Sequence, residues 1–238
     1  MCDVCGCGDT KRVSVDVHAS LLAGNDAAAR HLREHFTAAG VLALDVMGSP
    51  GSGKTALVEA TARALGGRLR LAAVSGDLAT ALDAERLRAA GVPSATITTG
   101  TACHLDAAMV HDALHEPALA DAVRGCDVFF IENVGNLVCP AIYDLGEGAR
   151  VVALSVTEGV DKPLKYPVMF RKADLVVLTK VDLLPHLRGV TVEALRENVA
   201  RVMPAAQVIE TSAVTDQGVA EFVAWIESRR RVLASAAP

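Results

Sequence analysis

Short apolar runs recur along the chain, and each is about as long as one strand of a buried sheet. Strands covered on both faces have no solvent side, so continuous runs of this kind are typical of parallel sheets. Stretches with helical spacing of apolar residues separate most of the runs, which also favours a parallel sheet. We therefore predict an α/β fold, a mostly parallel sheet flanked by helices, with strands near 41–47, 69–74, 95–99, 127–131, 151–156, 174–179 and 206–210.

Apolar residues at helical spacing also predict the helices of this domain. The segment from Thr10 to about Val17 is polar and is predicted to be a linker. The chain then divides into a cysteine-containing tail with its linker, residues 1–17, and one domain, residues 18–238. The predicted helices cover 18–39, 56–65, 80–90 and 217–233, and one more carries His111 and His115.

The stretch after the first predicted strand matches the phosphate-binding P-loop pattern G-x-x-x-x-G-K-[ST] without a mismatch. Glycines let backbone N–H groups turn toward phosphate oxygens, and the following helix N-terminus adds partial positive charge. Lys54 is predicted to neutralise the β- and γ-phosphates, and the Thr55 hydroxyl to bind Mg²⁺. The predicted phosphate-binding residues are Gly48, Ser49, Pro50, Gly51, Ser52, Gly53, Lys54 and Thr55.

Two acidic residues follow predicted strands at the same sheet edge as the P-loop. Asp77 comes just after the second strand, and Glu132 follows a buried strand at the position of a Walker-B acid. We predict that Thr55, Asp77 and Glu132 hold Mg²⁺, directly or through water, and with Lys54 form the catalytic set. Gly135 offers a backbone N–H and hinge freedom, as a γ-phosphate sensor requires.

Thr179, Lys180 and Asp182 form a T-K-x-D motif similar to the N-K-x-D motif that recognises guanine. The Asp182 carboxylate can accept from guanine N1–H and N2–H₂, donors that adenine lacks. Ser212 and Ala213, after the last strand, are similar to the loop that offers a backbone N–H to guanine O6. Thr179 replaces an asparagine that braces the base-binding loops, which predicts a lower nucleotide affinity. If these residues form no base pocket, the chain is an ATPase instead.

Charge and apolar patterning exclude some classes of partner. The net charge of −5 argues against a nucleic-acid surface. No apolar run reaches the ~18 residues of a membrane span, and no secretory leader pattern opens the chain, so we predict a cytoplasmic protein without a membrane partner. Six cysteines in such a protein indicate metal or redox chemistry rather than disulfides.

Cys2, Cys5 and Cys7 crowd three thiols into the pattern C-x-x-C-x-C. Three thiolates and one further ligand, such as the terminal amine, complete a four-coordinate site that suits Ni²⁺, Zn²⁺ or Cu⁺. A zinc ribbon is not favoured, because no second cysteine pair follows at suitable spacing. The alternative is an oxidisable tail that binds no metal.

Cys103 and His104 form a second candidate ligand pair, at a predicted strand-to-helix turn. Cys139 becomes a third ligand if the fold brings these loops together, and a second subunit could complete the set. Alternatively, Cys103 is a small buried apolar side chain and His104 a helix N-terminal residue, and spacing does not decide between the two. Two histidine pairs at i, i+4 spacing are predicted to lie on solvated helix faces: His31 with His35, and His111 with His115.

Together these motifs resemble the HypB family, the nickel-incorporation GTPases of [NiFe]-hydrogenase maturation. The combination of cysteine tail, Cys-His pair and E-N-V-G-N stretch is far more specific than the P-loop alone. The resemblance implies the fold of a SIMIBI-type P-loop GTPase, with GTP as substrate, Mg²⁺ as cofactor and slow intrinsic turnover. The matching stretches span nearly the whole chain: Cys2-x-x-Cys5-Gly6-Cys7, the P-loop, Gly76-Asp77, Thr101–Asp106, Glu132–Asn136 with Cys139, and Thr179–Asp182.

The resemblance further implies a protein that binds Ni²⁺ and assists its insertion into the hydrogenase large subunit, with a HypA-type accessory protein. It implies a homodimer that depends on GTP and metal. It also implies a tight nickel site at the tail cysteines and a weaker site at Cys103, His104 and Cys139, where Zn²⁺ also fits. The chain lacks the long histidine-rich insert of some relatives, so nickel storage is not implied, and service to urease stays open.

Chain order adds a mechanism, because a loop that senses γ-phosphate at Gly135 also carries Cys139. Two alternatives stand beside nickel delivery. One is a metal-buffering protein whose P-loop only senses nucleotide. The other is a GTPase that serves another metallocentre, such as urease or a cobalamin enzyme, against which the cysteine tail argues.

Overall fold

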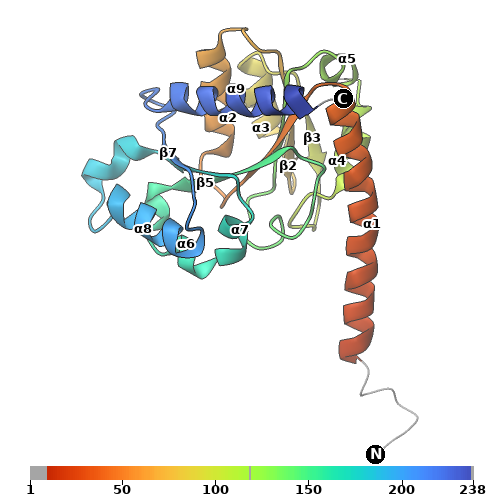
Figure 1. Cartoon of the computed structure of the whole chain (residues 1–238), viewed down its shortest axis with the longest axis horizontal. Helices are drawn as coiled ribbons and strands as arrows, with labels where there is room; N and C mark the ends of the chain where they lie inside the picture. The colour runs from red at the N-terminus through yellow and green to blue at the C-terminus, as the bar shows by residue number, and fades with distance from the viewer. Residues whose placement is uncertain (1–9, 118, 237–238) are drawn as a thin grey trace, which may run out of the picture.

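The computed structural model describes residues 10–117 and 119–236, and a single seven-stranded sheet forms its centre (Figure 1). The strand order is β3-β2-β4-β1-β5-β6-β7, and every neighbouring pair is parallel. The predicted fold class is confirmed, and each predicted strand is present within three residues of its expected ends. The strands are β1 (Leu42–Met47), β2 (Leu71–Asp77), β3 (Ser94–Thr98), β4 (Val128–Glu132), β5 (Ala149–Ser155), β6 (Leu175–Thr179) and β7 (Val208–Glu210).

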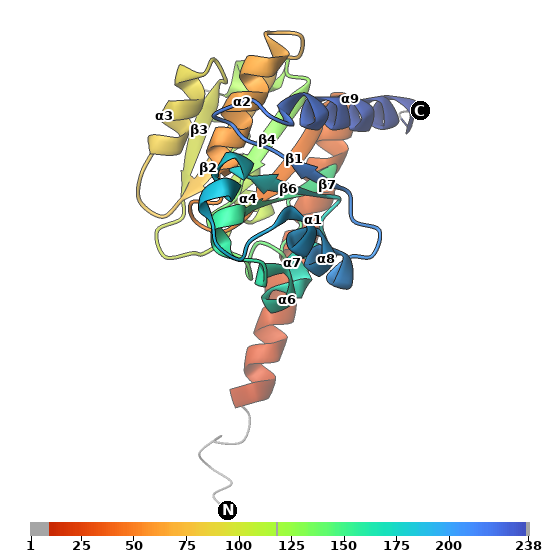
Figure 2. The same ribbon diagram turned by 90° about the vertical axis from the view of Figure 1, so that its left-hand side faces the viewer.

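Helices cover both faces of the sheet (Figures 1 and 2). One face carries α1 (Thr10–Ala38), α4 (Ala107–Leu114), α5 (Ala120–Val123), α7 (Pro167–Arg171) and α8 (Val192–Val202). The other carries α2 (Lys54–Leu65), α3 (Leu82–Ala89) and α9 (Val219–Ala236). The remaining short elements are η1 (Val156–Glu158), α6 (Lys162–Lys165) and η2 (Val181–His186). Among the described residues, no helix combines the length and apolar content that crossing a bilayer needs.

Strand β4 shows why a continuous apolar run forms the centre of this fold. Phe129 and Ile131 face one layer of helices, and Val128 and Phe130 face the other, because successive side chains alternate across a strand. All four side chains are fully buried. The Phe129 ring stacks on Phe36 of α1 with ring centroids 5.4 Å apart, so the strand and the helix share one core.

Helix α1 begins at Thr10, so the polar segment predicted to be a linker is helical instead. The described buried residues of α1 all lie in its second half: Asn25, Ala29, Leu32 and Phe36. Apolar spacing reports burial, and the first half of α1 extends away from the sheet (Figures 1 and 2). The prediction was wrong there because the segment was interpreted from its polar residues, although Val13, Val17 and Leu21 recur at i, i+4 spacing.

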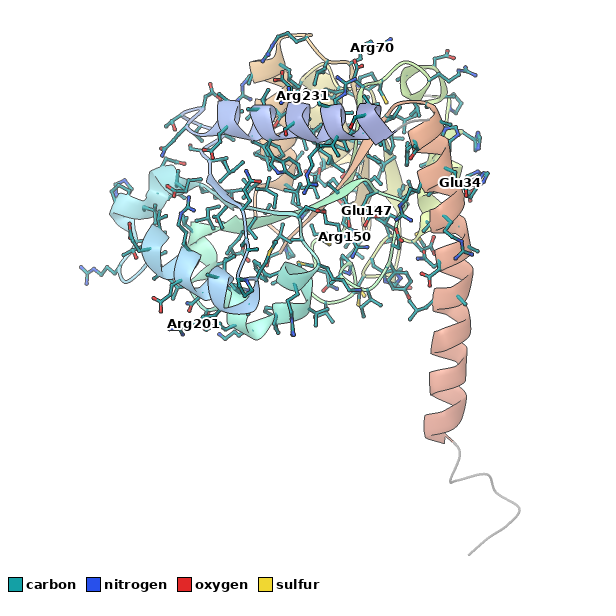
Figure 3. All side chains as sticks on the ribbon, viewed as in Figure 1. Glu34, Arg70, Glu147, Arg150, Arg201 and Arg231 are labelled. Carbon is teal, nitrogen blue, oxygen red and sulfur yellow. The ribbon has the colours of Figure 1, made fainter. Side chains whose placement is uncertain are left out.

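The segment before β5 holds the second half of α1 against the sheet. Asp144 accepts a hydrogen bond from Arg33 at 2.6 Å, and its carbonyl oxygen accepts one from the Asn25 amide at 2.9 Å. Arg150 of β5 forms an ion pair with Glu147, and both are labelled near the centre of Figure 3. Gly146 lies so close to α1 that a Cβ atom there would stand 2.7 Å from the Leu32 Cβ.

We expect Gly146→Ala to lower the free energy of unfolding by about 3 kcal/mol, because the added methyl group would push α1 off the sheet. Gly189→Ala is the matched control. Its φ of +72° nearly equals the +75° of Gly146, but no described atom lies within 4 Å of an added Cβ. Backbone strain alone should cost about 1 kcal/mol there. Urea unfolding of both variants measures the difference, and equal losses would show that the α1 contact contributes nothing.

Candidate functional site

The P-loop wraps the carboxyl end of β1 and leads directly into α2. Gly53 precedes the helix with a φ of +91°, a backbone conformation that other residues rarely adopt. The Lys54 ammonium lies 3.3 Å from the Ser49 carbonyl oxygen, and burial lowers its pKa. A buried cation folded against the loop matches the phosphate-neutralising role predicted for Lys54.

Thr55 lies between two carboxylates beneath the P-loop. Its Oγ1 is 2.7 Å from Glu132 Oε1 and 3.0 Å from Asp83 Oδ1. Glu132 is buried, and burial raises its pKa to about 7, against the smaller opposing effects of Thr55 and Lys54. Its other oxygen, Oε2, is buried and has no hydrogen-bond partner within residues 10–117 and 119–236. An unpaired carboxylate oxygen beside a hydroxyl fits a hard cation such as Mg²⁺.

Asp83, in the first turn of α3, was missed by the sequence analysis. Its only signal is an acid near a helix N-terminus, which equally well complements the helix dipole. Asp77, predicted to approach Mg²⁺, is the last residue of β2 and lines the same pocket. Its carboxylate accepts hydrogen bonds from the Thr80 hydroxyl and the Ala79 N–H, and the Thr80 bond lowers its pKa. Thr55 therefore contacts Asp83 as well as Glu132, and Asp77 does not contact it directly.

A pocket of about 490 Å³ opens at the carboxyl edge of the sheet, where parallel α/β folds bind their ligands. Its walls are the P-loop, Asp77, Asp83, Glu132–Gly135 and Lys180. A Cβ atom on Gly135 would stand 2.8 Å from the Pro50 Cα, so only glycine lets this loop approach the P-loop so closely. The structure thus brings most of the predicted phosphate-binding residues, the predicted Mg²⁺ residues and Gly135 to one pocket.

Of the predicted base-binding residues, Lys180 lines this pocket and Thr179 contacts the P-loop next to it, whereas Asp182, Ser212 and Ala213 do not line it. The Thr179 hydroxyl donates to the Ser52 carbonyl oxygen at 2.5 Å, and Lys180 Nζ donates to the Gly51 carbonyl oxygen at 2.6 Å. Thr179 thus ties its own loop to the P-loop through a hydroxyl, at the position where the related motif has an asparagine amide. Asp182 follows, half-buried, in η2.

Ser212 and Ala213 form a fixed turn beside these segments. The Ser212 hydroxyl accepts from the backbone N–H groups of Val214 and Thr215 at 3.3 and 3.2 Å. The Ala213 carbonyl oxygen accepts from Arg63 of α2 at 2.8 Å. These bonds hold the turn while using no backbone donor of Ala213, the group predicted to meet a base oxygen.

Cys103, His104 and Cys139 come together, with one possible ligand atom from each within 4.8 Å of the others. The two sulfur atoms are 2.9 Å apart, and the His104 ring stacks on Tyr143 with centroids 3.9 Å apart. Burial lowers the His104 pKa, which favours the neutral imidazole that binds metals. The interpretation of Cys103 as a buried apolar side chain is not supported, because it is half-exposed and faces the two other ligands. Cys126, by contrast, is buried, and burial raises its pKa to about 11.

Asn136 joins the P-loop to this metal triad, which we define as Cys103, His104 and Cys139. Its backbone forms an antiparallel bridge with Gly48, the first P-loop residue. Its side-chain amide donates to the Cys103 carbonyl oxygen at 3.2 Å. One residue therefore contacts both the phosphate-binding loop and the backbone of a candidate ligand. Cys2, Cys5 and Cys7 lie outside the described residues.

Known proteins are similar to this chain over nearly its whole length. The family model described as CobW/HypB/UreG, nucleotide-binding domain matches residues 42–210. A relative from Azotobacter vinelandii, hydrogenase maturation factor HypB, is 50% identical over 214 residues, covering 90% of this chain and 69% of its own length.

Two solved structures are similar to the whole fold. HypB from Helicobacter pylori in complex with nickel has a TM-score of 0.82 and 38% identity, covering 87% of this chain and 95% of its own. The hydrogenase maturation factor HypB from Archaeoglobus fulgidus has a TM-score of 0.78 and 40% identity, covering 89% of this chain and 100% of its own.

The raised pKa of Glu132 predicts a pH-dependent loss of stability in the ligand-free protein. Between about pH 4.5 and 7 the native state keeps a proton on Glu132 that the unfolded chain has lost, so this carboxyl lowers stability as pH rises. Glu132→Gln cannot ionise. Its stability relative to the wild type should therefore grow across this window and level off above pH 7, at about 3 kcal/mol at most.

Urea unfolding at several pH values, without nucleotide or metal, measures this difference. Glu85→Gln is the control, since Glu85 is an exposed acid on α3. A Glu132→Gln effect that does not change with pH would contradict the assignment.

Proposed function

Because the chain belongs to the HypB hydrogenase maturation factors of the CobW/HypB/UreG family, we propose that it is a GTP-hydrolysing metallochaperone for nickel. It binds Ni²⁺ as cargo and assists its insertion into the large subunit of a [NiFe]-hydrogenase. The observation that carries the proposal is the contact of Asn136 with both Gly48 and Cys103, because it joins the nucleotide site to a nickel-binding donor set. Thiolate and imidazole ligands suit Ni²⁺, and Zn²⁺ fits the same triad.

Each residue around the γ-phosphate position has a role in hydrolysis of GTP to GDP and phosphate. Lys54 would neutralise phosphate charge, Thr55 and Glu132 would hold Mg²⁺, and Asp77 and Asp83, on the wall of the same pocket, would contact the ion through water. Bound Mg²⁺ supplies positive charge that stabilises the phosphates as the bond breaks. Arg86 lines the pocket, but Glu59 holds its guanidinium at 2.7 Å. We therefore expect slow intrinsic turnover, on the order of 10⁻⁴ to 10⁻² s⁻¹.

Nucleotide and metal influence each other through the loop 132–139. The close approach of Gly135 to Pro50 supports a role for the Gly135 backbone N–H as the γ-phosphate sensor. Movement of this loop on GTP binding carries Asn136 and Cys139 with it, which changes the geometry of the metal triad. Because coupling free energies are reciprocal, metal at the triad changes GTP affinity by the factor by which GTP changes metal affinity.

The proposed assembly is a homodimer that GTP and metal promote, working in the cytoplasm with a HypA-type accessory protein. Exposed apolar side chains around the pocket and the triad support an interface there. Leu78 is 47% exposed and lines the pocket, and Val138, beside Cys139, is 54% exposed. Burying such side chains against a second copy removes apolar surface from water. The tail cysteines Cys2, Cys5 and Cys7 form the tighter nickel site in this proposal.

We expect two thiolate-containing Ni²⁺ sites in the reduced full-length protein. Cys2→Ala should remove the tighter one and Cys103→Ala the weaker one. A non-hydrolysable GTP analogue should change the affinity of the weaker site by about 5- to 150-fold, the usual range of coupling between sites. Equilibrium dialysis with and without the analogue measures both sites, and Cys126→Ala is a buried-cysteine control that should leave both in place.

Nickel bound only at the tail, with no effect of the analogue, would reject the coupling. The chain would then be a metal-buffering protein with nucleotide sensing, or a GTPase for another metallocentre such as that of urease. Incubation with apo-hydrogenase and apo-urease, each scored for bound nickel, separates these two.

Base specificity gives an independent test of the Asp182 assignment. Asp182→Asn should weaken GTP binding by at least about a hundredfold, because two hydrogen bonds to a carboxylate are lost. Affinity for xanthosine triphosphate should rise in return, since xanthine carries a carbonyl oxygen where guanine has its amino group, and the new amide can donate to it. A variant that binds ATP and GTP as the wild type does would show that Asp182 does not read the base.

A further inference from the structure

Four of the seven histidines of this chain line a single pocket outside the nucleotide site and the metal triad. They form two pairs with i, i+4 spacing, one on each of two packed helices. The pocket has a volume of about 270 Å³. Its histidines are His31 and His35 of α1, and His111 and His115 of α4 or its C-cap.

The imidazole rings already approach one another across the two helices. The ring centroids of His31 and His111 are 5.8 Å apart, and those of His111 and His115 are 4.9 Å apart. His31 and His115 are exposed, and His111 is half-buried. Nitrogen ligands of a tetrahedral ion lie about 3.4 Å apart, given metal–nitrogen distances near 2.1 Å. Metal binding therefore requires rotation about the side-chain bonds of these histidines.

The helices that carry these rings are firmly packed. Leu32 and Phe36 of α1 and Val110 of α4 belong to one buried cluster. Ala107, the first residue of α4, donates its N–H to the Asn25 side chain of α1 at 2.9 Å. Sites built on packed helices hold their ligands with little loss of conformational entropy. Glu34, labelled on α1 in Figure 3, marks the turn between His31 and His35.

Charges around the pocket also favour a cation there. Asp112 Oδ1 lies 3.5 Å from His111 Nδ1, and a carboxylate on one ring nitrogen orients the other nitrogen toward a metal. Arg124 is the cation on the pocket wall, and its guanidinium is paired with Asp121. A divalent ion entering the pocket therefore meets an arginine whose charge is already balanced.

We propose that His31, His111 and His115 bind a divalent transition-metal ion, with His35 as the nearest further imidazole. An all-imidazole set selects Ni²⁺, Zn²⁺ or Cu²⁺ and not the hard cations Mg²⁺ and Ca²⁺. It differs from the metal triad because it contains no thiolate. The bound ion links α1 to α4, the helix that begins three residues after His104, and so stiffens the segment that follows the triad.

Ni²⁺ binding to the reduced full-length protein tests this site. The variants are His31→Gln with His111→Gln, the control His186→Gln on exposed η2, and Cys103→Ala. The double histidine variant should lose one nickel equivalent, or bind it at least about tenfold more weakly, while thiolate-to-nickel absorption stays unchanged. Cys103→Ala should do the opposite, losing the thiolate absorption of the metal triad while keeping that of the tail site and the histidine-bound equivalent. His186→Gln should match the wild type.

Thermal unfolding gives a second readout. Nickel should raise the melting temperatures of the wild type and of His186→Gln by more than that of the double histidine variant. In the first two proteins the bound ion links α1 to α4, and in the double variant it cannot. Circular dichroism without metal confirms that the double variant is folded. The same stoichiometry and affinities in the double variant and the wild type would overturn the proposal. So would a wild type whose nickel is bound at thiolate sites alone.

Discussion

The pairing of β1 with β4 is the constraint on which the rest of the site depends. Neighbouring parallel strands end at the same sheet edge, so the loop after β1 and the loop after β4 must meet there. One loop is the P-loop, and the other runs from Glu132 to Cys139. The P-loop and the metal triad are thereby connected through the contacts of Asn136 with Gly48 and Cys103.

The sheet could be predicted from the sequence because its strands are continuous apolar runs bounded by glycine and polar residues. The P-loop and the polar residues that follow each strand could be predicted in the same way, from their positions directly after apolar runs. The first half of α1 was missed, because its polar residues indicated a linker although Val13, Val17 and Leu21 recur at helical spacing. Asp83 could not be predicted, because its importance rests on a contact with Thr55 made across the fold. At position 179 the sequence showed that the asparagine amide is missing. It did not show that the Thr179 hydroxyl bonds to the P-loop.

The site and the strand beneath it contain buried carboxylates, which lower the stability of the fold. Glu132 is buried with one oxygen unpaired, and Asp45 of β1 is fully buried, with a pKa that burial raises well above its ordinary value. Asn133 donates to Asp45 at 3.1 Å and accepts from the Leu105 N–H at 3.3 Å, next to the metal triad. Proteins commonly give up stability where function needs a particular group. Here that loss lies at the base of the loop 132–139, which is proposed to move.

The length of α1 limits what the first residues of the chain can reach. From Thr10 to Asn25, where described burial begins, the helix spans about 22 Å and leads away from the sheet (Figure 1). Cys7 stands three residues before Thr10, a reach of about 10 Å even when fully extended. Within one intact chain, the effective concentration of the tail thiols at the metal triad is therefore low. For the proposed function, this tether favours transfer of an ion between the tail of one molecule and the triad of another over transfer within one chain.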